Sequence, residues 1–191
     1  DKALYSKWSE ELSLATLQFS KNVLAATNAY TLHITDEADL AGLPEFVKTM
    51  AAETAADKGL EGWAFTLDAP SYSPFLKYSS VRELRKEIWT AYNTRATSGE
   101  FDNTQIVRNI VDLRIKIANI LGYETYADYA LEERMAKDKK TAVDFIINLL
   151  EPSIEFAKKD IADVFAYAKK NGFEGKRLES WDFSYWSEKY Q

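Results

Sequence analysis

The chain contains no cysteine and only one histidine, His33. Without cysteine it can form no disulfide, no thiolate metal site and no thiol nucleophile. A catalytic zinc site typically uses three protein ligands, commonly two or more of them imidazoles or thiolates, so these residues cannot supply a conventional one. No Gly-x-Ser-x-Gly elbow accompanies the histidine, which argues against a serine hydrolase. A lone histidine in a strand-like segment more often has a structural role, and we predict neither a catalytic nor a metal-binding residue within the chain.

Glycine and basic residues are also scarce. The seven glycines form no phosphate-binding loop or dinucleotide fingerprint, and no helix-loop-helix calcium loop is present. Lys and Arg number 24 against 30 Asp and Glu, which gives a formal charge of −6. Nucleic acid is therefore not an expected partner. No apolar run reaches the roughly 20 residues that cross a bilayer, so we expect no membrane partner either. The compartment stays open between the cytoplasm and the periplasm.

Helical periodicity dominates what is present. Apolar residues recur at spacings of three and four through most of the chain, which predicts a mainly α fold. The predicted helical segments are residues 2–27, 36–40, 44–58, 80–96, 103–121, 125–130, 141–170 and 181–190. Ser80, Asp102 or Asn103, and Thr125 are the expected N-caps of three of them. Pro152 predicts a kink or a new helix start within residues 141–170.

Two short segments break the helical pattern. Residues 30–34 and 62–67 alternate apolar and polar side chains and are rich in β-branched and aromatic types, which predicts a small two-stranded β element. No fixed-period repeat or low-complexity linker divides the chain. We therefore expect residues 1–191 to form a single multi-helix lobe.

An aromatic stretch follows the second predicted strand. Pro70 and Pro74, together with two serines, predict a non-helical path that delays the next helix until about residue 79 or 80. Three aromatic residues lie in this predicted loop: Tyr72, Phe75 and Tyr78. They either plug a gap between helices or line a groove. In the second case they are the candidate substrate-binding residues.

Paired carboxylates occur one helical turn apart in two places. Glu83 with Glu87, and Asp128 with Glu132, place both acids on one helix face. A chain with 30 acidic residues contains such pairs by chance, and nothing near them predicts the raised pKa that a general acid needs. We interpret both pairs as solvated helix surface.

An ordered set of short segments resembles the thimet oligopeptidase and peptidyl-dipeptidase family of zinc peptidases, and within it most of all the bacterial peptidyl-dipeptidase and oligopeptidase A branch. The segments are Asn22-Val23-Leu24, Leu40-Ala41-Gly42-Leu43-Pro44, Gly62-Trp63-Ala64-Phe65-Thr66-Leu67, Pro70-Ser71-Tyr72-Ser73-Pro74-Phe75-Leu76, Leu84-Arg85-Lys86, Arg95 with Asp102-Asn103, Leu121-Gly122-Tyr123-Glu124-Thr125-Tyr126-Ala127-Asp128, and Trp181-Asp182 with Tyr185-Trp186. No single segment is diagnostic, but the order and spacing agree along essentially the whole chain.

The resemblance implies a mainly helical, two-lobed enzyme closed around a channel that admits short peptides. It also implies a zinc ion held by a His-Glu-x-x-His helix, whose glutamate activates water. That motif is absent from the sequence, so no zinc ligand or catalytic base is assigned to any position. We expect an interior fragment, inactive alone, whose partners are short peptides and the remainder of its own polypeptide. Zinc is expected in the full-length protein and not in this fragment.

Two other classes stay open at this point. A self-standing helical binding or scaffold module would have no large exposed apolar patch. A carboxylate-dependent hydrolase complete within these residues would be active without a metal. The choice between dipeptide release and internal cleavage would be made by parts of a peptidase that these residues do not include.

Overall fold

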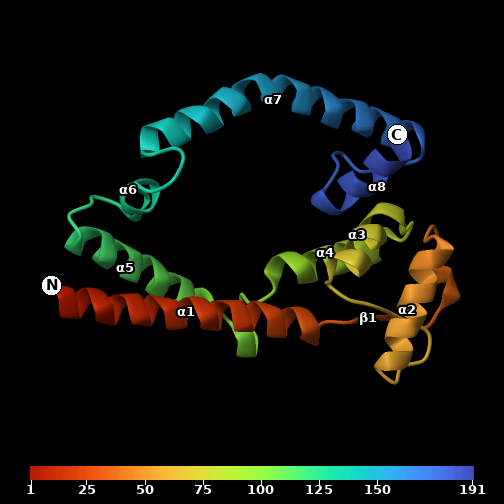
Figure 1. Cartoon of the computed structure of the whole chain (residues 1–191). Coiled ribbons are helices and arrows are strands. Elements are labelled where there is room, and N and C mark those ends of the chain that lie inside the picture. The colour runs from red at the N-terminus through yellow and green to blue at the C-terminus, as the bar shows by residue number, and fades with distance from the viewer. The chain divides into compact units, whose positions relative to one another are not determined.

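The computed structural model describes residues 1–191, which form eight α-helices, two 3₁₀ helices and two short strands (Figure 1). In chain order they are α1 (Lys2–Ala29), β1 (Leu32–Ile34), η1 (Glu37–Leu40), α2 (Glu45–Asp57), β2 (Trp63–Phe65), α3 (Ala69–Tyr78), α4 (Arg82–Thr94), η2 (Gly99–Phe101), α5 (Thr104–Ile120), α6 (Tyr126–Leu131), α7 (Lys139–Lys170) and α8 (Ser180–Tyr190). The prediction of a mainly α chain with one small β element is confirmed.

The chain divides into two compact units. Unit 1 comprises Asp1–Val23 and Ala96–Lys158, and unit 2 comprises Leu24–Arg95 and Lys159–Gln191. Two of the three boundaries between the units fall within the two longest helices, α1 and α7, and the third follows the end of α4, between Arg95 and Ala96. That residues 1–191 belong to one lobe of a larger protein stays a prediction.

Unit 2 is built on the small sheet. Strands β1 and β2 pair antiparallel, with Leu32 opposite Phe65 and Ile34 opposite Trp63. Helix α2 packs on β2 and ends ahead of Gly59, whose φ of +68° is the left-handed conformation that terminates many helices. The main core contains Leu32, Ile34, Leu40, Leu43, Val47, Ala51, Phe65, Leu67, Phe75, Leu76 and Ile88. This core fixes the positions of α2, β2 and α3 relative to one another.

A second apolar cluster lies at the C-terminal end of unit 2. Val164 and Ala168 of α7 pack with Phe173 and with Tyr185 and Trp186 of α8. Helix α8 in turn contacts α3 and α4. The aromatic C-terminal segment is therefore joined to the main body of the unit.

In unit 1, α5 packs against α6 and buries Leu113, Ile117 and Ala118. Helix α6 begins with the predicted cap: the Thr125 side chain accepts from the Asp128 N–H, and the Asp128 carboxylate accepts from the Thr125 N–H. None of the helices is long and apolar enough to cross a membrane.

The predicted loop after β2 is wrong, because Ala69–Tyr78 forms helix α3. Pro70 occupies the first turn, where the missing N–H would have no intrahelical partner. Pro74 is inside the helix, where proline costs about 3 kcal/mol. Phe75 and Leu76 are 0% and 6% exposed, and burying two such side chains contributes about 3–6 kcal/mol. Tertiary burial thus outweighs the proline penalty.

Two further local predictions need correction. Ser80 does not cap α4, which begins at Arg82 with Val81 as the N-cap, and the Val81 N–H instead donates to the Ser79 hydroxyl. Pro152 does not start a new helix, because α7 runs as one helix from Lys139 to Lys170 with Pro152 inside it. The cap at α5 is Asn103, but its side chain makes no capping bond.

Candidate functional site

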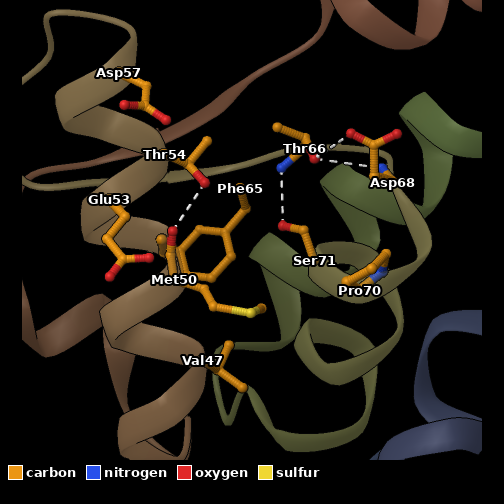
Figure 2. Close-up of a pocket in the computed structure, with 11 residues that line it drawn as sticks. Val47, Met50, Glu53, Thr54, Asp57, Phe65, Thr66, Asp68, Pro70 and Ser71 are labelled. Atoms are coloured by element: carbon orange, nitrogen blue, oxygen red, sulfur yellow. Dashed lines mark hydrogen bonds between the residues drawn. The ribbon is translucent and has the colours of Figure 1, made fainter.

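A pocket of about 280 Å³ opens in unit 2 between α2 and the start of α3, with the Phe65 ring of β2 between the two helices (Figure 2). Its lining residues are Val47, Met50, Ala51, Glu53, Thr54, Asp57, Phe65, Thr66, Asp68, Pro70 and Ser71. The α2 members recur at spacings of three and four, so they share one face of that helix. The main core holds this face against β2.

Most neutral polar groups of the pocket are already paired. The Thr66 N–H donates to the Ser71 hydroxyl at 3.0 Å, and the Thr66 hydroxyl donates to the Asp68 carboxylate at 3.0 Å. The Thr54 hydroxyl donates to the Met50 carbonyl, four residues earlier in α2, at 2.8 Å (Figure 2). Threonine side chains within helices often make this bond to their own backbone. The groups that remain for a ligand are chiefly the carboxylates.

The pocket is acidic. Glu53, Asp57 and Asp68 belong to the lining, and no Lys or Arg does. A ligand with an ammonium or guanidinium group suits such a lining, because carboxylates accept charge-assisted hydrogen bonds from both. The sequence contains the Glu53/Asp57 pair at helical spacing, but it contains other pairs like it, and only the packing of α2 distinguishes this one.

The residues present do not fit a zinc ion. No group of three or more His, Cys, Asp or Glu side chains is placed to hold a metal. His33 lies on β1, where its Nε2–H donates to the Glu61 carbonyl at 2.6 Å. A single imidazole used in this way leaves no ligand set that matches zinc chemistry. No catalytic step through a metal can be assigned to these residues.

The three predicted substrate-binding residues have three different environments. Phe75 is 0% exposed and packs edge-on against Phe65 with the ring centroids 4.6 Å apart. Phe75 therefore plugs a gap between packed elements and does not line a groove. Tyr78 is partly buried, and its hydroxyl donates to the Glu188 carboxylate at 3.0 Å. None of the three predicted residues lines the acidic pocket.

Tyr72 is partly buried and belongs to an aromatic stack with Tyr92, which is partly buried too. Its ring lies parallel to that of Tyr92 on α4, with centroids 4.1 Å apart and planes inclined by 15°. The Arg95 guanidinium lies 3.7 Å from the Tyr92 ring centroid. Burial raises the pKa of Tyr72 above its ordinary value, and the neighbouring Tyr92 adds to the effect. Tyr72 thus presents a neutral hydroxyl beside a cation.

Asp128, one of the paired carboxylates interpreted as surface, has a local role. Asp128 completes the cap of α6 and also pairs with Lys139 at 2.9 Å. Its hydrogen bonds from Lys139 and then Thr125 hold the pKa of this carboxyl below its usual value. A carboxyl with a lowered pKa is a poor general acid at neutral pH.

The chain belongs to peptidase family M3, because the sequence model of that family matches residues 75–191. The chain is 38% identical over 190 residues to the oligopeptidase A of Escherichia coli (strain K12), a match that covers 97% of this chain and 28% of that protein. It is 38% identical over 193 residues to the probable cytosolic oligopeptidase A of Arabidopsis thaliana, covering 97% and 27%. Identity to the dipeptidyl carboxypeptidase of E. coli is 30% over 190 residues, covering 98% and 28%. The chain therefore spans little more than a quarter of the length of these curated relatives.

Proposed function

We propose that residues 1–191 form the substrate-side portion of a zinc peptidase that hydrolyses short peptides. The zinc ligands and the catalytic base would come from other parts of the same polypeptide. One observation carries this proposal: the chain matches relatives named as oligopeptidases over 97% of its own length, yet it holds no ligand set for a metal. By itself the 191-residue chain would be inactive.

Two features of unit 2 support a peptide-facing role. The acidic pocket suits the amino terminus or a basic side chain of a peptide. The Tyr72–Tyr92 stack suits an apolar or aromatic side chain, and Arg95 stands beside it with a positive charge. Both features could form part of a channel wall that contacts peptides through their side chains.

A peptide could also bind as an additional strand beside β2, but this mode of binding has less support. Ala64 and Phe65 are each 1% exposed, so the main chain of this strand has little room for an added peptide strand. The peptide-facing role is therefore supported by Tyr72 and the acidic pocket, whereas Phe75 belongs to the core and the Tyr78 hydroxyl is paired with Glu188.

A self-standing helical module is the less favoured function. Such a module should expose no large apolar patch, because contiguous apolar surface in water promotes association. Large apolar side chains of α7 are extensively exposed instead, among them Phe145 at 63% and Phe156 at 72%. This exposure fits a portion of a larger protein better.

The proposal is tested by extending the polypeptide at both ends to the length of the relatives. With zinc, the extended protein should cleave internally quenched peptides, a chelator should abolish the cleavage, and the 191-residue chain should be inactive under the same conditions. Zinc-independent cleavage by the 191-residue chain, or no cleavage by the extended protein, would contradict the proposal.

The contact residues are tested in the extended protein with three variants, two at Tyr72 and one at Glu53. Tyr72→Ala should lower kcat/KM on several peptides, while Tyr72→Phe, which keeps the ring stack, should lower it less. Glu53→Gln should act selectively on peptides with a basic residue. Unchanged kinetics for all three variants would leave these residues a packing role only.

A further inference from the structure

The part of α7 that belongs to unit 1 carries a broad apolar surface that no other element of unit 1 covers. Six large side chains define it, and we call it the α7 apolar face: Phe145, Ile146, Leu149, Leu150, Ile154 and Phe156. Their exposed fractions range from 38% for Ile154 to 72% for Phe156. At 100° per residue these six positions cover roughly 180° of the helix circumference. Half of this helix surface is therefore apolar and exposed to water.

A narrow polar stripe occupies the opposite side of the same helix segment. Asp144, Asn148, Glu151 and Glu155 follow one another at spacings of four, three and four residues. This spacing keeps them on one line along the helix. A helix with one polar line and a wide apolar arc is typical of an element packed on most of its circumference. The sequence of α7 is thus suited to a buried position with a single face in water.

The C-terminal part of the same helix shows what this face does when it is covered. Ile146 and Val164 are 18 residues apart, as are Leu150 and Ala168, and 18 residues are about five turns of α-helix. Each pair therefore lies on one line of the helix. Val164 and Ala168 are 4% and 0% exposed in the cluster with Phe173, Tyr185 and Trp186. Ile146 and Leu150, on the same lines, are 59% and 49% exposed.

We propose that the α7 apolar face is the docking face for helices of the same polypeptide that lie outside residues 1–191. This inference rests on the part of the proposed function that places the chain within a longer protein. The relatives are more than three times as long as the match, since the chain covers 28% of them, so covalently attached partner segments are available at high local concentration. An arc this wide needs contact on two sides, which two helices packed beside α7 would provide.

Charge argues against a membrane as the occupant. Between residues 141 and 157 the helix carries three acidic residues and no Lys or Arg. Helices that lie on anionic membranes usually carry basic residues on their polar face. The acidic stripe instead suits a helix whose polar line faces water.

Cysteine labelling of the extended protein tests the proposal, because residues 1–191 contribute no cysteine of their own. I146C places a thiol on the α7 apolar face, and N148C places a matched thiol on the polar stripe two residues away. Labelling by a maleimide is read at each site by peptide mass spectrometry, first in the folded protein and then in denaturant. The expected result is at least tenfold slower labelling at I146C than at N148C in the folded protein, and equal rates in denaturant.

Each alternative occupant has its own signature. Equal labelling of both sites in the folded protein would overturn the proposal. If the protection is lost on dilution and light scattering gives the mass of a dimer, the occupant of the α7 apolar face is a second copy of the chain. If the protection appears only when anionic lipid vesicles are added, the occupant is a membrane surface. If I146C does not fold, L150C gives the same comparison.

The labelling result is independent of peptide hydrolysis, which is measured on the same samples. A protected I146C site in a protein that cleaves no peptide would retain the docking face and reject the peptidase proposal. An active peptidase with an unprotected I146C site would retain the peptidase proposal and reject the docking face.

Discussion

The carboxylate of Asp182, at the start of α8, is fully buried and accepts a hydrogen bond at 3.2 Å from Arg85 of α4, itself 2% exposed. Arg82 adds two further bonds of 2.8 Å each to the two oxygens of the same carboxylate. Arg85 also donates to the main-chain carbonyls of Ser79 and Trp181. Burial lowers the pKa of Arg85, and the hydrogen bond to Asp182 opposes that shift. This network connects α4 to α8.

Removing the charge of Asp182 should strongly destabilise the chain. Asp182→Asn keeps the shape of the side chain but leaves the buried Arg85 without its counter-charge, which typically costs about 3–5 kcal/mol. Arg177→Gln is the control, because the Arg177–Glu179 pair has an arginine side chain 80% exposed and such pairs contribute at most about 1 kcal/mol. Urea unfolding followed by circular dichroism measures both. Equal effects of the two variants would show that the buried network does not hold α8.

Gly42 should tolerate no side chain, whereas Gly59 should tolerate one at moderate cost. Both have positive φ, of +86° and +68°, and a residue other than glycine costs about 1–2 kcal/mol there. A Cβ at Gly42 would lie 2.4 Å from the Tyr78 carbonyl oxygen, while a Cβ at Gly59 would meet nothing within 4 Å. Gly42→Ala should therefore cost about 1–3 kcal/mol more than Gly59→Ala. Thermal and urea unfolding compare the two, and similar losses would contradict the close approach.

The buried Asn103 should be coupled energetically to Asn22. Asn103 is 3% exposed, accepts from the Asn22 amide at 2.9 Å and donates to the Phe19 carbonyl at 3.1 Å. Asn103→Ala should cost about 1–3 kcal/mol, because it removes both bonds and leaves polar groups unpaired. A double-mutant cycle with Asn22→Ala measures the pairwise part, expected at about 0.5 kcal/mol or more. Strictly additive effects would mean that the contact contributes nothing.

Tyr30 should make stability fall at alkaline pH. Its burial, and then the charge of the nearby Glu87, raise the pKa of Tyr30 to about 12 from an ordinary 10.0, although its hydroxyl forms no hydrogen bond of good geometry. Between these two values the unfolded chain loses the Tyr30 proton while the folded chain keeps it, so the free energy of unfolding decreases as pH rises. Below pH 10.0 the group contributes no slope. Tyr30→Phe should flatten the profile from pH 10 to 12 in urea titrations, and an unchanged slope would contradict this origin.

Local sequence patterns predicted most elements because their signals need few distant contacts. The 3.6-residue periodicity located α1, α2, α5 and α8 to within a few residues, and the Thr125–Asp128 capping box was recognisable because both partners lie within one turn. The same reasoning failed at α3, where two prolines argued for a loop. The burial of Phe75 and Leu76, which reverses that argument, depends on β2 and α2.

The candidate site was less predictable than the fold. Tyr72, Phe75 and Tyr78 form one cluster in the sequence, but the helical spacing of α3 directs one into the core, one onto Tyr92 and one to Glu188. The acidic pocket had no recognisable sequence pattern, because Glu53 and Asp57 resemble every other acid pair on an exposed helix. Only the packing of α3 beside α2 makes them part of a pocket.

Sequence alone determined that the chain is mainly helical, that it resembles a zinc peptidase family, and that it lacks the imidazoles and thiolates of a zinc site, because periodicity and residue inventory are properties of the chain itself. Tertiary structure decided which acids share a pocket, which aromatic residue is core, and that Asp182 meets Arg85 across 97 positions of sequence. Those outcomes depend on burial and on pairing between distant segments, and burial is set by whatever packs against a residue rather than by its neighbours along the chain.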